Sequence, residues 1–103
     1  MTDLMEPTFE KMQASADSAS SLLKSMANEN RLLILCQLVE GERSVSELQR
    51  QLPLSQSALS QHLAVLRREG LVATRRSAQS IYYSLASAEA SAVLATLYEL
   101  YCT

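Results

Sequence analysis

The chain has 103 residues, of which 48% are apolar and 19% are charged, and its net charge is −2. This length predicts one domain, and the apolar content suffices for a core and argues against long disordered segments. The longest apolar run covers residues 32–36, which is too short to cross a bilayer. With two glycines, two prolines and no tryptophan, collagen-like, low-complexity and glycine-rich phosphate-loop proteins are excluded.

The charges are distributed unevenly along the chain. Residues 1–42 carry three basic and seven acidic side chains, whereas residues 43–76 carry six arginines and two glutamates. A local arginine block in an acidic protein favours nucleic-acid binding through one face, because arginine contacts phosphate in a bidentate manner. The alternative is a solvated surface with uneven charge. Residues 1–10 hold three acidic residues and no apolar stretch, so we expect no secretory signal and a cytoplasmic protein.

Two helices are predicted in the first 40 residues. Residues 9–26 repeat apolar side chains at steps of three and four, which indicates a helix with a narrow apolar stripe. That stripe suits either a helix of a second subunit or the core of the same chain. A second helix is expected over residues 29–40, with Asn28 as its N-cap and Gly41 as its end. Its expected apolar face consists of Leu32, Leu35, Cys36 and Val39.

The central segment has the signals of two helices separated by a tight break. Ser44 and Glu47 form a capping-box pattern that opens a short helix over residues 44–52, and Pro53 ends it. Another helix is expected over residues 55–69. Two helices separated by such a break are typical of a helix-turn-helix.

The periodicity then changes to that of a hairpin. Residues 71–76 and 81–85 are predicted to be strands, joined by a polar loop over residues 77–80. A last helix begins after Ser87. The predicted fold is therefore mainly α with a small β-hairpin, a single winged helix-turn-helix domain over residues 1–103.

The helix predicted over residues 55–69 has two contrasting faces. At about 100° per residue, the leucines at 59, 63 and 66 form the core face. The opposite face is small and polar, and it holds Ser57, Ser60, Gln61, Ala64 and Arg68. Short side chains allow a helix to enter the major groove, where Gln61 can pair with adenine. Gln56 lies in the first turn, where helix ends meet phosphates. The alternative is an exposed helix of no particular role.

Arginines flank this helix on both sides. Arg67 and Arg68 close it, and Arg75 and Arg76 are expected at the tip of the wing. All four are candidates for phosphate or minor-groove contacts, or are free surface cations. His62, the one histidine of the chain, lies at the edge of the core face. It is a candidate either for a structural hydrogen bond or for a DNA contact.

Three segments resemble the ArsR/SmtB family of winged-helix repressors. They are ANENRLLIL from residue 27, LSQSALSQHL from residue 54 and LRREGLV from residue 66. The resemblance extends over residues 19–102. It implies a homodimer joined by its first and last helices, which binds an inverted-repeat operator in double-stranded DNA and releases it when an inducer binds.

Many members of this family sense metals, but the metal ligands are not in this sequence. The family's Cys-x-Cys pair falls at Ser44 and Ser46, and residues 87–103 contain neither histidine nor aspartate. We therefore expect no metal site and no cofactor.

Cys36 and Cys102 are the two cysteines of the chain. Their positions resemble those of the sulfide- and redox-responsive branch of the family. That resemblance implies a dithiol sensor, bridged by an oxidant or a reactive sulfur species, whose bridged form loses DNA. Without this resemblance, Cys36 is interpreted as an inert buried thiol. The remaining alternatives are a repressor with a metal or organic inducer, a thiol peroxidase or reductase using Cys36, and a winged-helix protein-interaction module.

Overall fold

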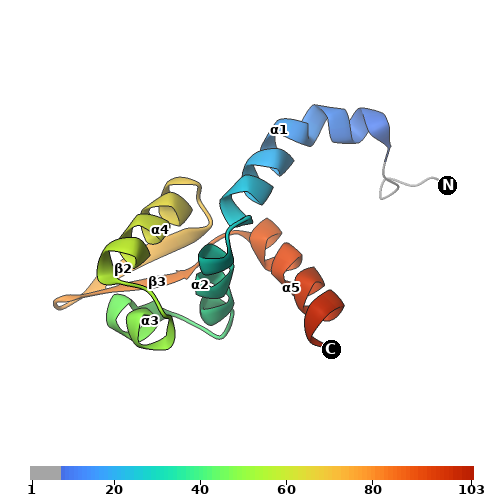
Figure 1. The fold of residues 1–103 in the computed structure, drawn as a ribbon. Helices are drawn as coiled ribbons and strands as arrows, with labels where there is room; N and C mark the ends of the chain where they lie inside the picture. Colours follow the sequence, from blue (N-terminus) through green and yellow to red (C-terminus); the bar gives the residue numbers. More distant parts are fainter. Residues whose placement is uncertain (1–7) are drawn as a thin grey trace.

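The computed structural model describes residues 8–103, so most of the predicted signal-free segment 1–10 lies outside the described residues (Figure 1). The described part measures 53 × 30 × 21 Å, and its length comes from α1, which projects away from the other elements. The elements in chain order are α1 (Phe9–Met26), α2 (Glu29–Val39), β1 (Arg43–Ser44), α3 (Val45–Gln51), α4 (Gln56–Arg68), β2 (Val72–Ser77), β3 (Ser80–Leu85) and α5 (Ala88–Cys102).

Side-chain caps begin the helices at the predicted places. The Asn28 carboxamide oxygen accepts hydrogen bonds from two backbone N–H groups at the start of α2. The Ser44 hydroxyl accepts from the N–H of Glu47, whose carboxylate accepts from the N–H of Ser44, so the capping box of α3 is complete. Ser55 caps α4 and Ser87 caps α5 in the same manner.

The break between α3 and α4 and the end of α4 have clear local causes. Leu52 has extended backbone, because the residue before a proline is disfavoured in a helix. Gly70 ends α4 with φ of +81°, a left-handed conformation that glycine adopts without strain. The chain reverses there, and the N–H of Leu71 donates to the carbonyl of Leu66 at 2.9 Å. This reversal sends the chain from α4 into the wing.

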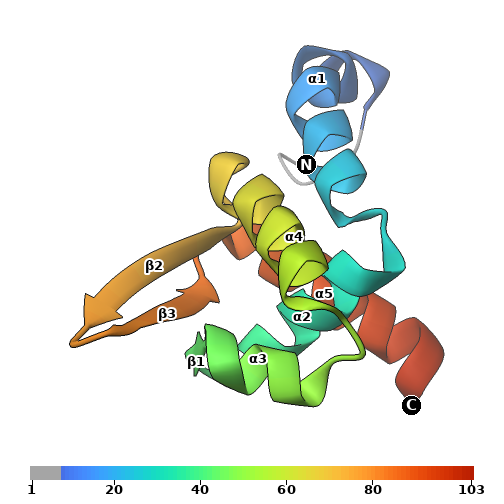
Figure 2. The ribbon, with the colours of Figure 1, turned by 60° about the vertical axis from the view of Figure 1, so that its left-hand side comes forward.

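The wing is an antiparallel hairpin with one additional strand. The sheet order is β1-β3-β2, and in Figure 2 the β2–β3 hairpin extends outward beside α4. The predicted polar loop is shorter than expected, since the strands continue to Ser77 and Ser80 and leave a two-residue turn. β1 was not predicted, because a strand of two residues has no periodicity to detect. The winged helix-turn-helix fold is confirmed.

One core holds the helices and the base of the wing together. The predicted core face of α4 is confirmed, since Leu59, Leu63 and Leu66 are at most 2% exposed. Burial of each such side chain contributes about 1.5–3 kcal/mol relative to an exposed one. The other core side chains, from every helix and the wing, are Met26, Ile34, Leu35, Leu38, Leu48, Leu52, Leu71, Val72, Ala90 and Leu94.

The predicted apolar face of α2 is wrong in part. Leu35 is buried as expected, but Cys36 and Val39 are exposed, and the buried positions are Ile34, Leu35 and Leu38. Residues 32–36 are all apolar, so periodicity alone does not select the buried side of this helix. The choice is made by the packing of α2 against α4 and β3.

Within residues 8–103, no helix combines the length and the apolar character needed to cross a membrane.

Candidate nucleic-acid interface and thiol pair

The polar face of α4 is open to solvent along its length. Its members Ser57, Ser60, Gln61, Ala64 and Arg68 are all exposed, as is Gln56 in the first turn, and the leucines behind them are buried. The buried leucines hold the helix rigidly against the core, so the exposed side chains stand on a fixed support. The helix face that the sequence predicts is therefore presented outward, as reading a duplex groove requires.

A groove runs between α4 and the wing. Its α4 side is formed by Gln56, Ser60, Leu63, Ala64, Arg67 and Arg68, and its floor by Val45, Ile81 and Tyr83. Apart from its two arginines, Gln56 and Ser60, the lining of this groove is largely apolar. Arg67 and Arg68 are the groups of this groove that are suited to contact a phosphate.

The four predicted phosphate-binding arginines have different surroundings. Arg68 lies 3.4 Å from the carboxylate of Glu69 in an exposed ion pair. Within residues 8–103, the side chains of Arg67 and Arg76 make no hydrogen bond or ion pair, and both are exposed. Arg75 is held by Glu42 through two hydrogen bonds of 2.7 and 2.9 Å. Arg67 and Arg76 are therefore the two that a phosphate can engage without displacing a partner.

His62 lies half-buried at the edge of α4, and its ring faces α2. Its Nδ1 is 3.5 Å from Nη1 of Arg31, at the outer limit of a hydrogen bond. Nε of the same arginine donates to the carbonyl of Ser25 at 2.6 Å, and Nη2 donates to that of Lys24 at 3.3 Å. Arg31 thus links the end of α1 to α4, and the contact favours a structural role for His62.

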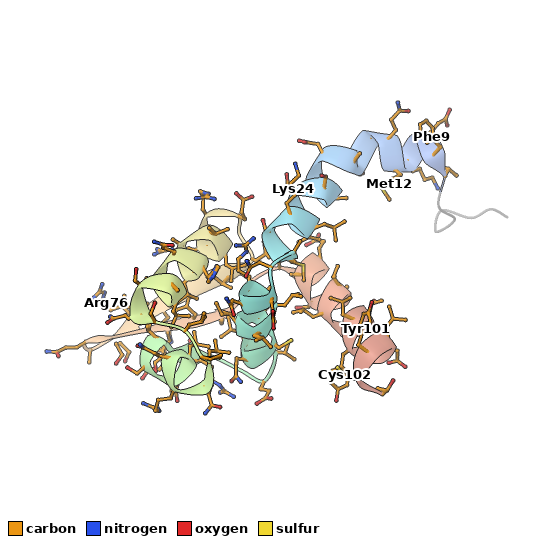
Figure 3. All side chains as sticks on the ribbon, in the orientation of Figure 1. Phe9, Met12, Lys24, Arg76, Tyr101 and Cys102 are labelled. Atoms are coloured by element: carbon orange, nitrogen blue, oxygen red, sulfur yellow. The ribbon has the colours of Figure 1, made fainter. Side chains whose placement is uncertain are left out.

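The two cysteines are free thiols, and both are exposed. Cys36 lies on α2 and Cys102 ends α5, and these two helices contact each other (Figure 3). The pKa of the Cys36 thiol is raised, first by partial burial and then by the charge of the Cys102 thiolate. The exposure of Cys36 argues against an inert core thiol. The two cysteines stand apart in this structure, and no disulfide joins them.

A second type of surface covers α1 and the end of α5. Large apolar side chains are exposed on both helices, and Figure 3 shows Phe9 and Met12 at the N-terminal end of α1 and Tyr101 near the end of α5. We call this set the apolar seam: Phe9, Met12, Leu23, Tyr98, Leu100 and Tyr101, each at least 55% exposed. Both helices thus carry several large apolar groups that the core of this chain does not cover.

Metal-ligating side chains are scattered over the described part of the chain. No group of three or more histidine, cysteine, aspartate or glutamate side chains within residues 8–103 is arranged to hold a metal ion.

Two residues of these surfaces had no signal in the sequence, namely Arg31 and Glu42. Their partners at His62 and Arg75 are 31 and 33 residues away along the chain. Neither contact has a characteristic spacing, because both arise only from the packing of the elements.

The chain is similar to bacterial regulatory proteins over nearly its full length. The description "Bacterial regulatory protein, arsR family" matches residues 28–74. The chain is 55% identical to the transcriptional activator HlyU of Vibrio cholerae, over 91% of this chain and 87% of that protein. It is 44% identical to the biofilm growth-associated repressor of Xylella fastidiosa, over 93% of this chain and 84% of that protein.

Solved structures agree with these similarities. Reduced HlyU from Vibrio cholerae matches with a TM-score of 0.86 and 54% identity, over 92% of this chain and all of that chain. The transcriptional repressor BigR from Xylella fastidiosa matches with a TM-score of 0.89 and 42% identity, over 94% of this chain and 99% of that chain.

Proposed function

Because the chain belongs to the arsR family of bacterial regulatory proteins, we propose that it binds an operator as a homodimer and releases it when Cys36 and Cys102 are bridged. Its class is established by the family: it is a DNA-binding transcriptional regulator and not an enzyme. The proposal adds three points: which surface contacts DNA, that the protein acts as a homodimer, and that a bridge between two thiols causes release of the DNA.

The exposed polar face of α4 beside the wing is the observation that carries the DNA part of the proposal. In the dimer, two copies of α4 enter successive major grooves of an inverted repeat, about 34 Å apart. Gln61 and the serines at 57 and 60 contact base edges, and Gln56 contacts the backbone. The arginines at 67, 68, 75 and 76 supply phosphate affinity, directly or by supporting the wing. Binding then weakens steeply with salt.

The apolar seam supports the homodimer. It lies on the first and last helices, away from α4 and the wing, so a second copy can cover it without covering the reading surface (Figure 3). The long free part of α1 is a natural partner for the same helix of another copy, because its apolar residues recur at steps of three and four.

The two exposed thiols support the dithiol signal. An organic persulfide can act as the oxidant: one thiolate takes its outer sulfur and releases the organic thiol, and the second protein thiol displaces that sulfur as hydrogen sulfide. Two protein thiols and one persulfide thus give one disulfide, one thiol and hydrogen sulfide. Hydrogen peroxide oxidises the two thiols to the same disulfide and is itself reduced to two waters. A disulfide needs Cα atoms about 4.4–6.8 Å apart, so the bridge holds α2 and α5 together.

The bridge is expected to act on DNA through the dimer. α5 contributes to the apolar seam, and α2 packs against α4. A bond between α2 and α5 therefore changes the relative orientation of the two α4 helices in the dimer. A coupling free energy of about 1–3 kcal/mol gives a 5- to 150-fold change in operator affinity.

The DNA surface is tested by selecting duplexes from a random pool and then comparing Gln61→Ala with Gln13→Ala. Gln13 is an exposed glutamine on α1 and serves as the matched control. We expect Gln61→Ala to lose about 1–3 kcal/mol of discrimination at one base pair of each half-site. Equal affinities of the two variants for all duplexes would argue against reading by α4.

The signal is tested with Cys36→Ser and Cys102→Ser, each measured on the selected operator before and after treatment with a persulfide or a peroxide. Thr103→Ala is the control, because it alters the same end of α5 and keeps both thiols. We expect the parent and the control to release DNA and both serine variants to stay bound. Release of a serine variant as readily as the parent would refute the dithiol switch.

A further inference from the structure

One ion pair in the molecule crosses the whole sheet. Glu42 lies just before β1, the strand at one edge, and Arg75 lies in β2, the strand at the other edge. Both oxygens of the carboxylate accept hydrogen bonds from the guanidinium, at 2.7 and 2.9 Å. On its way across, the guanidinium lies 4.7 Å from the centre of the Tyr82 ring on β3. Bidentate geometry and a cation over an aromatic ring are both favourable arrangements.

The register of the hairpin separates Arg75 from its neighbour Arg76. Arg75 is paired with Tyr82 and Arg76 with Ile81 across the two strands. Side chains alternate between the faces of a sheet, and cross-strand partners share a face. Because Ile81 lines the groove beside α4, Arg76 belongs to the groove face and Arg75 to the opposite one.

The electrostatics keep this pair charged. Hydrogen bonds from Arg75 are the main reason that the pKa of the Glu42 carboxyl is lowered. The other ion pairs within residues 8–103 are local, since Arg43 contacts Glu40 three residues earlier and Arg68 contacts the adjacent Glu69. Among the described residues, the Glu42–Arg75 pair is thus the ion pair that joins the hairpin to the segment after α2, in addition to the backbone pairing of β1 with β3.

We propose that Glu42 and Arg75 form a strap that sets the position of the wing, and that Arg76 is the wing arginine that contacts DNA. Arg75 is then a positioning residue, not a phosphate ligand. This inference rests on the proposed DNA-binding surface and deepens it, because it assigns different roles to two adjacent arginines. β2 is an edge strand that pairs only with β3, and the strap reaches it from the opposite edge of the sheet.

The experiment compares the single variants Glu42→Arg and Arg75→Glu with the double variant E42R/R75E. The double variant keeps the net charge of the parent and reverses the pair. We expect each single variant to lower operator affinity about two- to fivefold, as for an exposed ion pair of good geometry. The double variant should return to within about twofold of the parent. Glu40→Gln is the control, because it removes an exposed ion pair that does not cross the sheet.

Salt dependence separates the two arginines. We expect Arg76→Ala to lower the slope of log affinity against log salt by about 0.9 for each phosphate that the variant no longer binds. Arg75→Ala should lower affinity and leave that slope unchanged. A double variant no better than Arg75→Glu, together with a reduced slope for Arg75→Ala, would overturn the strap and make Arg75 a phosphate ligand.

A measurement without DNA tests the strap independently of the proposed function. Backbone amides of β2 and β3 should exchange hydrogen faster in Glu42→Gln than in Glu40→Gln. If the parent binds no duplex but this difference is found, the proposed function fails and the strap stands. Equal exchange in the two variants would overturn the strap, whatever the protein binds.

Discussion

Two exposed surfaces of this molecule differ in chemistry. The face of α4 beside the wing is polar, with serine and glutamine between arginines, whereas α1 and the end of α5 expose phenylalanine, methionine, leucine and tyrosine. Exposure alone therefore does not identify a partner. Short polar side chains on a rigid helix suit base edges and phosphates, and large apolar side chains suit another protein surface. The two surfaces are joined through α2, which contacts α1, α4 and α5.

The largest effect is expected from a charge in the apolar seam. Leu23→Asp places a carboxylate where a second copy is proposed to pack, so we expect a monomer in sedimentation. Operator affinity should fall at least about 100-fold, because a monomer engages one half-site and loses the gain from two linked contacts. Ser18→Asp adds the same charge on an exposed polar position of α1 and should stay dimeric. A dimeric Leu23→Asp would place the partner surface elsewhere.

The link between the two surfaces is tested at Arg31. Arg31→Met keeps the aliphatic stem but removes the hydrogen bonds to the carbonyls of Ser25 and Lys24. We expect the free energy of unfolding to fall by about 2 kcal/mol in urea at fixed protein concentration, since charged donors contribute about 1.5–3 kcal/mol. Arg50→Met, an exposed arginine of α3, should change little. Equal stability of the two variants would show that the joint between α1 and α4 does not depend on Arg31.

A smaller effect is expected where α4 turns into the wing. Gly70→Ala adds a methyl group with no heavy atom within 4 Å, so the cost comes from the backbone at φ of +81°. We expect a loss of about 1 kcal/mol in the free energy of unfolding, and a smaller loss for Gly70→Asn, because asparagine tolerates this conformation better. Thermal unfolding of the three proteins measures the order. Equal stability of Gly70→Ala and the parent would mean that the backbone of this turn shifts to a conformation that alanine tolerates.

The smallest effect concerns the reactivity of the Cys36 thiol. The pKa of Cys36 is raised mainly by burial, so the remaining thiol of Cys102→Ser should still titrate above the ordinary range for cysteine. Its thiolate fraction at neutral pH is then low and increases with pH. We expect alkylation of Cys36 in Cys102→Ser to be slow near pH 7 and to keep accelerating above a pH of about 8.5, the ordinary pKa of cysteine. An alkylation rate that stops rising below a pH of about 8.5 would contradict a raised pKa for Cys36.

Much of the fold was predictable because its signals are local. The caps at Asn28, Ser44 and Ser55 and the glycine after α4 act within a few residues, and a leucine every third or fourth position marks the core side of α4. The polar face of the same helix was predictable for the same reason. Local signals of this type give helix boundaries within one or two residues.

Other features depended on contacts between distant segments. The buried side of α2 could not be read from a run of five apolar residues, and the strand at Arg43–Ser44 exists because β3 pairs with it. The different surroundings of Arg75 and Arg76 also arise from the sheet, since Glu42 is 33 residues before Arg75.

The amino-acid sequence by itself determined the winged-helix fold, the polar face of α4 and the family, because capping, periodicity and motif spacing are encoded over short stretches. Only the tertiary structure decided which apolar groups remain exposed, that Cys36 is accessible, and that one wing arginine is occupied by a glutamate. Those outcomes depend on which surfaces the packed elements bring together, and a single linear pattern does not contain that information.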